Sequence, residues 1–382
     1  MPERQRILWV MESLGVGGAE VAAIDLLREL SARGHSAEVV TLWGPYALEP
    51  ALEEAGIPVW HLRLGHRWRL DQGVRRLTRR LRINRPTVVH GQLFFPGVYV
   101  ALSCAIVRVP ARVVTFQNLG YESYPAETPW LKIRKCIDRS AMRHAIDGHI
   151  AVSEAVNRHY STHLRLAPMQ VIPNGIPARA IAAADGPQRE SISARYGLQE
   201  NRLLVVCPAR FVHEKGHRYL IEAVGQLRAA GVTPNVILAG DGPLRAEIAE
   251  LVRAATLGSV IQLPGVVPHD EVLDLMRAAD IVVLPSTHEG FPVAAAEAAA
   301  TGTAVVASDV GGLPDLFDGD AGILVPPRDP GALAAALRRV IEDEALRLSL
   351  GRRAQERTLR TCDIEQVANL HETLYEKLLQ GS

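Results

Sequence analysis

Short runs of apolar residues alternate along this chain with longer segments in which apolar residues recur every three or four positions. The short runs predict buried β-strands, and the longer segments predict amphipathic helices. Strands that alternate with helices build parallel sheets covered on both faces, so the pattern predicts a doubly wound α/β fold. Up to residue 145 the predicted strands are Ile7–Val10, Ala37–Leu42, Val88–Val89 and Val113–Phe116, and the predicted helices are Glu20–Arg33, Val74–Asn84 and Pro129–Ala145.

The alternation starts again beyond residue 170, and the two series predict two Rossmann-like domains. Two prolines and an Asn-Gly step between Val171 and Pro177 mark the boundary. We therefore expect domains at residues 1–170 and 171–363, with a final amphipathic helix in residues 364–382 packing back on the first domain. The second series of predicted strands is Arg202–Cys207, Asn235–Ala239, Val260–Leu263, Ile281–Leu284 and Ala304–Ala307.

Composition narrows the class of protein. The chain has 382 residues, 48% of them hydrophobic and 22% charged, which excludes disorder, collagen-like repeats and a disulfide-rich miniprotein. No apolar stretch reaches the length of a membrane span or a signal peptide, so neither is expected. Four cysteines without metal-binding spacing are typical of reduced thiols in a cytosolic protein: Cys104, Cys136, Cys207 and Cys362.

A glycine-rich turn follows the first predicted strand. Gly17 and Gly18 let a backbone approach an anion where a helix N-terminus supplies free N–H groups. Glu20 replaces the third glycine of the dinucleotide-binding pattern, although Glu38 stands near the separation expected for a ribose-binding carboxylate. Turns from strand to helix often contain glycine, so this turn alone is weak evidence.

A second candidate, the pair Arg210 and Lys215, lies on the loop after the first strand of the second series. A guanidinium and an ammonium on one loop can converge on a diphosphate. Either residue alone would be interpreted as a solvated surface charge. Because doubly wound folds bind ligands at the carboxyl ends of strands, the pair favours a binding site.

The third and strongest candidate is the segment from Glu289 to Glu297. Pro292 suits the first turn of a helix, whose free N–H groups can bind a phosphate or a sugar oxygen. The rise of a helix separates the two carboxylates by roughly 10 Å, a span similar to that from a sugar ring across a diphosphate to a ribose. Glu297 stands in an alanine-rich stretch, where a buried charge is costly without a partner or a ligand.

Together these residues resemble the retaining, nucleotide-sugar-dependent glycosyltransferases of family 4, which have the GT-B fold of two Rossmann-like domains facing a central cleft. The most specific element of the resemblance is the E-x7-E motif, here Glu289 and Glu297, preceded by Arg210 and Lys215. The resemblance covers nearly the whole chain, including Gly17-Gly18-Ala19-Glu20, Val152-Ser153-Glu154, Ile172-Pro173-Asn174-Gly175 and the C-terminal helix.

The resemblance implies two sets of contacts to the transferred sugar and the ribose. Glu297 would hold the ribose hydroxyls. Glu289 would hold the transferred sugar, together with the amides of Gly290, Phe291 and Pro292.

The remaining contacts implied by the resemblance concern the diphosphate and the base. Arg210 and Lys215 would bind the leaving diphosphate, and Gly17 and Gly18 would close over the phosphates. Gly265 belongs to the loop that would flank the base. The resemblance also implies a UDP- or GDP-sugar donor, a front-face retaining mechanism, and neither a metal nor another cofactor.

One position departs from the family pattern. Many members have a histidine in a T-x-H arrangement at the end of a first-domain strand, where this chain has Thr115-Phe116-Gln117-Asn118. We expect Gln117 or Asn118 to contact the donor sugar, because an amide binds a hydroxyl but does not titrate. His90 is then the remaining ionisable candidate facing the cleft, and a hydrogen-bonded structural histidine is an equal alternative.

Charge is divided unevenly along the chain. The totals are 42 Lys and Arg against 42 Asp and Glu, but residues 1–172 hold 22 against 15 and residues 173–382 hold 20 against 27. Nine basic residues and one acidic residue, Asp71, lie between Arg63 and Arg85, where His66-Arg67-Trp68 adds an aromatic ring. This mixture, repeated at Trp130–Arg143, predicts contact with an anionic membrane, and a solvated helix face is the equal alternative. No recognition module for nucleic acid is present.

The predicted function is transfer of a hexose from a nucleotide sugar to a glycan or lipid-linked acceptor bound by the first domain. The expected setting is cell-envelope, exopolysaccharide or glycolipid synthesis, in the cytoplasm or peripherally on the inner face of the cytoplasmic membrane. A nucleotide-sugar epimerase of the same fold and a binding-only homologue are the alternatives. The order of the E-x7-E motif favours transfer over epimerisation, and the presence of both glutamates and both basic residues favours it over binding alone.

Overall fold

The computed structural model describes residues 4–65, 69–121, 128–187, 189–317 and 319–381. The chain divides into two compact units, the first made of Met1–Ile176 with Ile364–Ser382 and the second of Pro177–Asp363. The division falls later than the predicted 170/171 because the short strand β7 (Gln170–Val171) is the last strand of the first unit's sheet.

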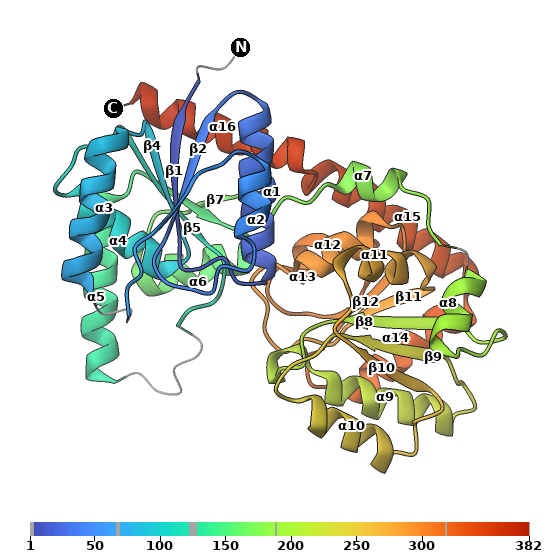
Figure 1. Cartoon of the computed structure of the whole chain (residues 1–382). Coiled ribbons are helices and arrows are strands. Elements are labelled where there is room, and N and C mark those ends of the chain that lie inside the picture. The colour runs from blue at the N-terminus through green and yellow to red at the C-terminus, as the bar shows by residue number, and fades with distance from the viewer. Residues whose placement is uncertain (1–3, 66–68, 122–127, 188, 318, 382) are drawn as a thin grey trace. The chain divides into compact units, whose positions relative to one another are not determined.

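The first unit is a parallel sheet of seven strands in the order β3-β2-β1-β4-β5-β6-β7, with helices on both faces (Figure 1). Its other strands are β1 (Arg6–Met11), β2 (Ser36–Thr41), β3 (Val59–His61), β4 (Val88–Gln92), β5 (Ala111–Phe116) and β6 (Gly148–Ala151). Its helices are α1 (Gly18–Ala32), α2 (Glu49–Glu54), α3 (Leu70–Asn84), α4 (Phe94–Cys104), α5 (Pro129–Ala145), α6 (Glu154–Leu164) and α16 (Ile364–Gln380).

The core of the first unit follows from the alternation of side chains along each strand. Ile7, Trp9 and Met11 of β1 point to one face, where they form a hydrophobic cluster with residues of α1 and α16. Helix α16 packs against α1, whereas α3, α4 and α5 form the layer on the opposite face, with α4 touching both of its neighbours. The final helix therefore supplies the first unit with part of its core, although it is the last element in the sequence.

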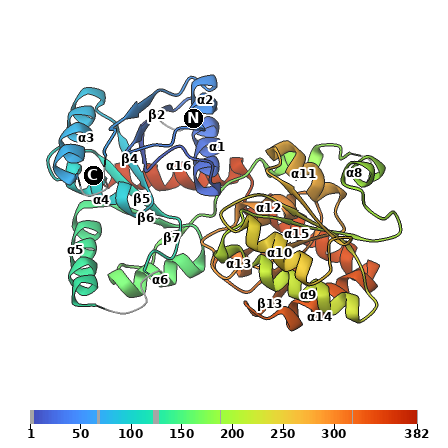
Figure 2. The ribbon, with the colours of Figure 1, turned by 60° about the horizontal axis from the view of Figure 1, so that its bottom comes forward.

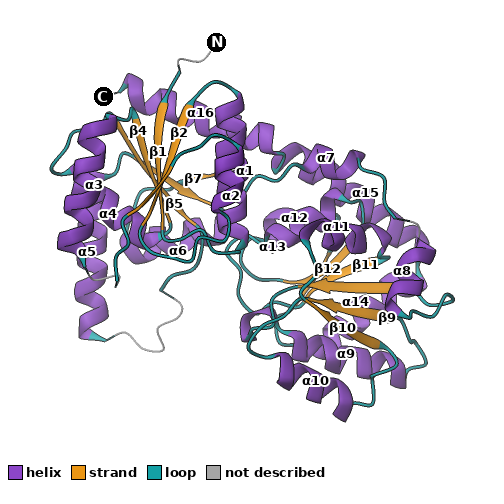
Figure 3. Ribbon diagram, viewed as in Figure 1, coloured by secondary structure: helices purple, strands orange, loops and turns teal. Residues whose placement is uncertain are grey.

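The second unit is a parallel sheet of six strands in the order β10-β9-β8-β11-β12-β13 (Figure 3). The strands are β8 (Leu204–Pro208), β9 (Asn235–Ala239), β10 (Ile261–Gly265), β11 (Ile281–Leu284), β12 (Ala304–Ser308) and β13 (Ile323–Val325). The helices are α7 (Ala178–Ala183), α8 (Arg189–Tyr196), the 3-10 turn η1 (His213–Lys215), α9 (His217–Ala229), α10 (Arg245–Ala254), α11 (His269–Ala278), α12 (Val293–Ala300), α13 (Leu313–Phe317), α14 (Pro330–Glu342) and α15 (Glu344–Thr361).

The predicted α/β class and the doubly wound arrangement are confirmed, and each predicted strand is found with shifted ends at most. The prediction missed the short strands β3, β6, β7 and β13, which have two to four residues each. So few residues do not establish a periodic pattern, and neighbouring strands supply most of the pairing that holds them in place.

Each sheet contains one point at which the strand order reverses. In the first unit β1 lies between β2 and β4, and in the second unit β8 lies between β9 and β11. The connections from these strands leave toward opposite faces, and the loops at their carboxyl ends separate to form a crevice. We therefore expect the site residues at the carboxyl ends of β1 and β4 in the first unit, and of β8 and β11 in the second.

Candidate functional site

The reversal point of the second unit brings together a lysine and a glutamate. Lys215 ends the short η1 turn after β8, and Glu289 lies on the loop after β11. The Lys215 Nζ is 2.6 Å from Glu289 Oε1, and the Ser286 hydroxyl donates a second hydrogen bond of 2.7 Å to the same oxygen. The sheet order thus places two of the predicted residues in direct contact.

Glu289 is held as a buried carboxylate. Its side chain is 8% exposed, whereas that of Lys215 is 29% exposed. A cation and a hydroxyl that both bind the same oxygen offset the cost of burying a carboxylate at this depth. Both of these hydrogen bonds use Oε1, so the other carboxylate oxygen, Oε2, is the atom of Glu289 from which a ligand contact is most easily made.

Glycines allow the surrounding loops to pack closely. Gly311, on the loop after β12, has a φ of +57°, and a Cβ at this position would lie 1.9 Å from the carbonyl oxygen of Glu289. Gly216, directly after Lys215, has a φ of +66°, and its Cβ would lie 2.0 Å from the carbonyl oxygen of Pro285. Only glycine fits both places, so the backbones on either side of the Lys215–Glu289 pair have a fixed position.

Arg210 lies on the same loop as Lys215 but is exposed. Within the described residues its guanidinium makes no side-chain hydrogen bond or ion pair. The predicted convergence of Arg210 and Lys215 on one anion therefore stays a prediction. The structure does show that one of the two cations is already paired and that the other is accessible to a ligand.

Helix α12 carries the second glutamate of the motif. Glu297 is 7% exposed within a stretch of buried alanines, and His269 Nε2, in the first turn of α11, is 3.3 Å from Glu297 Oε1. The sequence analysis missed His269, which no pattern in the chain distinguishes from the other histidines. The buried position expected for Glu297 is confirmed.

One expected contact requires a correction. Pro292 has no backbone N–H and cannot donate a hydrogen bond, so only the amides of Gly290 and Phe291 can serve a ligand at this turn. In the structure Pro292 is the N-cap of α12, and its carbonyl oxygen accepts a hydrogen bond from the Ala295 N–H. Phe291 itself is 7% exposed.

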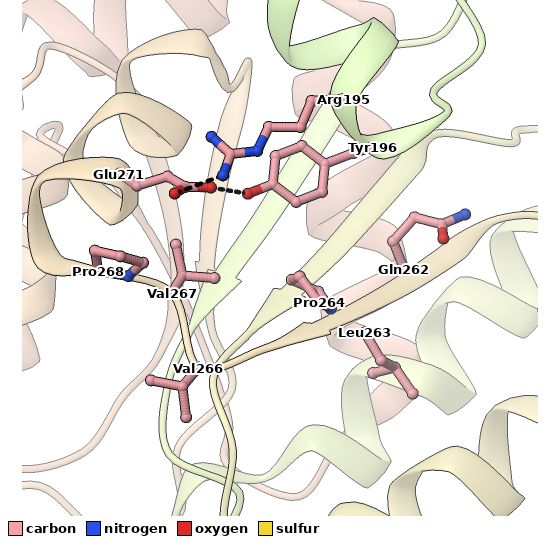
Figure 4. Close-up of a pocket in the computed structure, with 9 residues that line it drawn as sticks. All are labelled: Arg195, Tyr196, Gln262, Leu263, Pro264, Val266, Val267, Pro268 and Glu271. Atoms are coloured by element: carbon pink, nitrogen blue, oxygen red, sulfur yellow. Dashed lines mark hydrogen bonds and ion pairs between the residues drawn. The ribbon is translucent and has the colours of Figure 1, made fainter.

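The loop predicted to flank a base forms one wall of a pocket of about 430 Å³ (Figure 4). Gly265 ends β10 with a φ of +88°, and the residues that follow it line the pocket. On the opposite side Glu271 accepts a hydrogen bond from the hydroxyl of Tyr196 and forms an ion pair of 3.0 Å with Arg195. The remaining lining residues are Gln262, Leu263, Pro264, Val266, Val267 and Pro268.

In the first unit the glycine-rich turn lies at the carboxyl end of β1, as predicted. Gly17 is the N-cap of α1, and the Glu20 carboxylate lies against it, 2.4 Å from where a Cβ of Gly17 would stand. Gln92, at the end of β4, donates a 2.6 Å hydrogen bond to the carbonyl oxygen of Ala19 and accepts one of 2.9 Å from the Trp9 indole. Gln92 thus connects the two strands at the reversal point, and the sequence analysis missed it.

The two amides predicted near the donor sugar have partners within the first unit. Gln117 and Asn174 form a reciprocal pair, each amide donating to the other at 2.9 Å. Asn118 is exposed, and its side-chain oxygen accepts a hydrogen bond of 3.4 Å from the Tyr160 hydroxyl. Asn174 belongs to the Ile-Pro-Asn-Gly segment, whose role as a partner of Gln117 only the fold reveals.

The structure favours the structural alternative for His90. Its side chain is completely buried, with Nδ1 bonded to the Tyr375 hydroxyl at 2.7 Å and Nε2 bonded to the Thr115 hydroxyl at 2.6 Å. Burial, with a smaller contribution from His371, holds the pKa of His90 well below its usual range. Helix α16 supplies Tyr375 and covers the ring, so a neutral His90 does not reach a ligand on the surface.

Glu38 also has a structural role. It lies within β2 and is 8% exposed, and its two carboxylate oxygens accept hydrogen bonds from Arg80 and Asn84 of α3. A ribose-binding carboxylate would need to lie free at the end of the strand. The apparent dinucleotide-binding spacing in the first unit is therefore coincidental.

Family models match the two units separately. The model described as Glycosyltransferase Family 4 matches residues 16–180, and the model described as Glycosyl transferases group 1 matches residues 188–357. Together they span nearly the whole chain, in the order and with the division that the structure shows. The chain belongs to glycosyltransferase family 4. It is a glycosyltransferase, and its two Rossmann-like units are those of the GT-B fold.

Individual relatives agree with this assignment. The chain is 29% identical over 365 residues to 2-deoxystreptamine N-acetyl-D-glucosaminyltransferase of Streptomyces fradiae, covering 88% of this chain and 85% of that protein. It is 28% identical over 379 residues to D-inositol 3-phosphate glycosyltransferase of Kineococcus radiotolerans, covering 89% and 86%. The crystal structure of Anabaena HepE in complex with UDP-glucose is similar in fold, with a TM-score of 0.83, 22% identity and coverage of 98% and 100%.

Proposed function

We propose that this glycosyltransferase transfers a hexose from a UDP- or GDP-sugar to a glycan or lipid-linked acceptor with retention of configuration. The observation that carries the proposal is the buried Glu289, bound by Lys215 and Ser286 at the β8/β11 reversal point, with the exposed Arg210 on the same loop as Lys215. This arrangement offers an acceptor for sugar hydroxyls and two cations for a diphosphate within one crevice.

The cations serve the leaving group. When the bond between the sugar and the diphosphate breaks, negative charge develops on the diphosphate, and positive groups already in position lower the barrier. Lys215 is fixed by Glu289 before any ligand arrives, which removes part of the cost of ordering a flexible side chain. Arg210 closes on the phosphates from the exposed side of the same loop. No metal is invoked, and metal independence stays a prediction.

The carboxylates serve the hydroxyls of the donor. Glu289 binds the transferred sugar together with the amides of Gly290 and Phe291, and Glu297 binds the ribose. His269 lies beside Glu297 and holds its carboxylate toward the ribose hydroxyls. The base packs against the backbone that follows Gly265, at the edge of the pocket lined by Val266 and Val267.

Similar proteins support the donor class but leave the acceptor open. Anabaena HepE has been crystallised with UDP-glucose, and the chain has the same fold. The names of the related transferases refer to acceptors as different as 2-deoxystreptamine and inositol 3-phosphate. A glycan or lipid-linked acceptor, in the synthesis of an envelope polysaccharide or glycolipid, is our proposal on the evidence of the basic first unit.

We propose the cytoplasm as the place of reaction, with peripheral contact to the inner face of the cytoplasmic membrane. In the part of the chain that the structure describes, no helix is both long and apolar enough to cross a bilayer. Access to a lipid-linked acceptor would then come from surface contact, for which the first unit offers a specific face described in the next subsection.

Replacement of Glu289 tests the assignment. Glu289→Ala should lower the transfer rate by at least about 100-fold, because it removes an electrostatic contact to the reacting sugar. Nucleotide binding should change little, because the diphosphate and ribose contacts remain. A screen of nucleotide sugars by thermal shift identifies the donor first, and transfer is then measured by mass spectrometry with a panel of acceptors.

Glu247→Ala is the matched control, since Glu247 is an exposed glutamate on α10 of the same unit. It should leave both donor binding and transfer unchanged. Full transfer by Glu289→Ala would show that the site is wrongly assigned. Conversion of the donor to an isomeric nucleotide sugar without any acceptor would favour the epimerase instead, and binding without any turnover would favour the binding-only homologue.

A further inference from the structure

The two helical layers of the first unit carry opposite charge. Helices α3 and α5 together contain ten basic and two acidic residues, and α4, which lies against both, contains no charged residue. Helices α1 and α16, which pack on the other face of the sheet, contain six acidic and two basic residues. Figures 1 and 2 both place α3 and α5 together on one side of the sheet, away from α1. The unit is therefore strongly polarised across its sheet.

The basic layer also exposes large apolar side chains. Ile133 and Ile137 of α5 are 53% and 60% exposed, and their spacing of four residues puts them on one stripe of the helix. Ile83 in the last turn of α3 is 62% exposed. Single exposed apolar residues are common, but three isoleucines on two helices of one layer make up an unpartnered apolar surface.

The exposed cations of this layer lie on the same two helices as these isoleucines. Arg79, Arg82, Lys132 and Arg143 are exposed, and no ion pair connects them to another residue of the described chain. The side chain of Asp138, the one acidic residue of α5, is 5% exposed and faces Arg134 and Tyr121. The outer surface of α5 thus presents no carboxylate to weaken the positive potential.

The predicted basic segment Arg63–Arg85 contributes less than its sequence suggests. The Arg80 guanidinium binds Glu38 and stacks on the Trp60 ring, and Arg76 donates to the carbonyl oxygen of Leu62. Arg75 pairs with Asp71 at 3.1 Å. His66, Arg67 and Trp68 lie outside the described residues. The free cations of α3 are therefore Arg79 and Arg82, and the richer apolar and basic surface is on α5.

We propose that the outer surface of α3 and α5, defined by Arg79, Arg82, Ile83, Lys132, Ile133, Ile137 and Arg143, docks on an anionic lipid bilayer. We call it the α3–α5 face. Cations interact with lipid phosphates and carboxylates, while the isoleucines enter the boundary between headgroups and acyl chains. The acidic α1 and α16 layer is repelled by the same surface, so the charge asymmetry fixes which side of the unit meets the membrane.

Two other occupants fit this face less well. A second copy of the chain would bring two strongly positive faces together, and like charges oppose such contact. A nucleic acid would satisfy the cations but gains nothing from three exposed isoleucines, because phosphates bind polar groups. A bilayer surface can contact the cations and the isoleucines at the same time. The proposal rests on the membrane contact included in the proposed function and names the face that makes it, whereas donor binding and transfer are measured separately and can fail without it.

Vesicle flotation tests the proposal with three proteins. The wild-type chain should float with vesicles of phosphatidylglycerol and phosphatidylcholine at low salt, detach at high salt, and ignore vesicles of phosphatidylcholine alone. Lys132→Gln/Arg143→Gln should weaken partitioning about 25-fold, at about fivefold for each charge removed near the headgroups. Ile133→Ser/Ile137→Ser should weaken it at least about tenfold while the remaining binding stays sensitive to salt.

Two matched controls lie on the second unit. Leu348 on α15 is 65% exposed, and Arg352 and Arg360 on the same helix are also exposed. Leu348→Ser and Arg352→Gln/Arg360→Gln should leave partitioning unchanged. Every altered position is exposed, so far-ultraviolet circular dichroism and the thermal midpoint of all variants should match the wild type.

Several outcomes would overturn the proposal. These are absence of flotation at low salt, equal losses in the α15 controls, and a retained affinity in both variants of the α3–α5 face. A dimer detected by light scattering that dissociates in Ile133→Ser/Ile137→Ser would assign the face to a second copy. Tighter binding to a duplex or RNA oligonucleotide, unaffected by the isoleucine changes, would assign it to nucleic acid. A thermal shift with nucleotide sugar in every variant would show that the donor site is unaffected.

Discussion

The two units share a fold but differ in the chemistry at their reversal points. In the second unit, charged groups meet there, with Lys215 bound to Glu289 and Arg210 exposed nearby. In the first unit the side chains that join the strand ends are neutral, with Gln92 joining Trp9 to Ala19 and Gln117 joined to Asn174. Parallel topology gathers loops at both places, but only the side chains decide what the loops can bind.

The charged pair of the second unit and the neutral network of the first unit suit different roles. A charged pair is positioned to respond to charge that develops during a reaction, whereas a network of amides and rings fixes geometry without attracting ions. The Glu20 carboxylate beside Gly17 strengthens the contrast, because it lies where the first unit would otherwise bind an anion. Closure of Gly17 and Gly18 over a diphosphate therefore stays a prediction and requires Glu20 to turn aside.

Loss of the lysine should have the largest effect. Lys215→Ala leaves the buried Glu289 carboxylate without its cation and removes a contact to the diphosphate. Transfer should fall by about 1,000-fold, nucleotide affinity should fall with it, and the free energy of unfolding should drop by about 3 kcal/mol. Steady-state kinetics, calorimetric titration with nucleotide, and chemical denaturation measure the three changes.

The double variant Lys215→Met/Glu289→Gln separates the contribution of this ion pair to folding stability from its contribution to sugar transfer. It replaces both charges by neutral groups of similar size, so stability should recover toward the wild-type value while transfer stays low. Recovery of transfer along with stability would mean that the charges at the second reversal point matter only for folding, and the contrast between the units would lose its functional meaning.

A backbone change should have an intermediate effect. Gly311→Ala places a Cβ against the Glu289 carbonyl oxygen at a residue with positive φ, so the loop that carries Glu289 must move. We expect transfer to fall about tenfold to 100-fold and stability to fall by about 2 kcal/mol. Gly231→Ala is the control, since Gly231 has a φ of +81° and open space around it. The Gly231→Ala control should lose stability but keep its transfer activity. Equal losses of activity in both variants would contradict a role of Gly311 in positioning the loop that carries Glu289.

The smallest expected effect is the loss of folding stability at low pH. In the second unit burial is the main cause that lowers the pKa of one described histidine, His217, to about 4. In the first unit burial is the main cause that lowers the pKa of four described histidines. These four are His90, His149, His159 and His371, of which the last two have pKa values of about 4. The unfolded chain binds these protons near pH 6.5, so stability is lost as pH falls from about 6.5 toward 4.

Hydrogen exchange at pH 7 and pH 6 measures this difference between the units. Each histidine whose pKa lies near 4 should cost about 1 kcal/mol at pH 6, and the first unit has two of these against one, so exchange should accelerate more in the first unit than in the second. One group acts in the opposite direction, because burial raises the pKa of Asp138 to about 6 and acid therefore favours its folded form. A larger acid effect in the second unit would contradict the assignment of His90 and His371 to a neutral, structural network.

Patterns along the chain predicted the site in the second unit better than that in the first. Arg210, Lys215 and Glu289 stand on the loops that follow buried strands, where parallel sheets present side chains to a ligand, and Glu297 stands within the helix that follows one of these loops. His90 also follows a strand pattern, yet it is buried because Tyr375 of α16 covers it. Nothing in the sequence near His90 indicates a helix that returns from 285 residues away.

The sequence by itself determined the α/β class, the two series of strands, the positions of the glycines and the identity of the charged residues, because local periodicity and backbone preference act over a few residues. Tertiary structure alone decided that Lys215 contacts Glu289, 74 residues further along, since the contact requires β11 to pair with β8. It also decided that basic residues and isoleucines from the two helices α3 and α5 lie in one helical layer. Contacts between distant segments depend on how sheets and helices pack to bury apolar surface, and no short stretch of sequence contains that information.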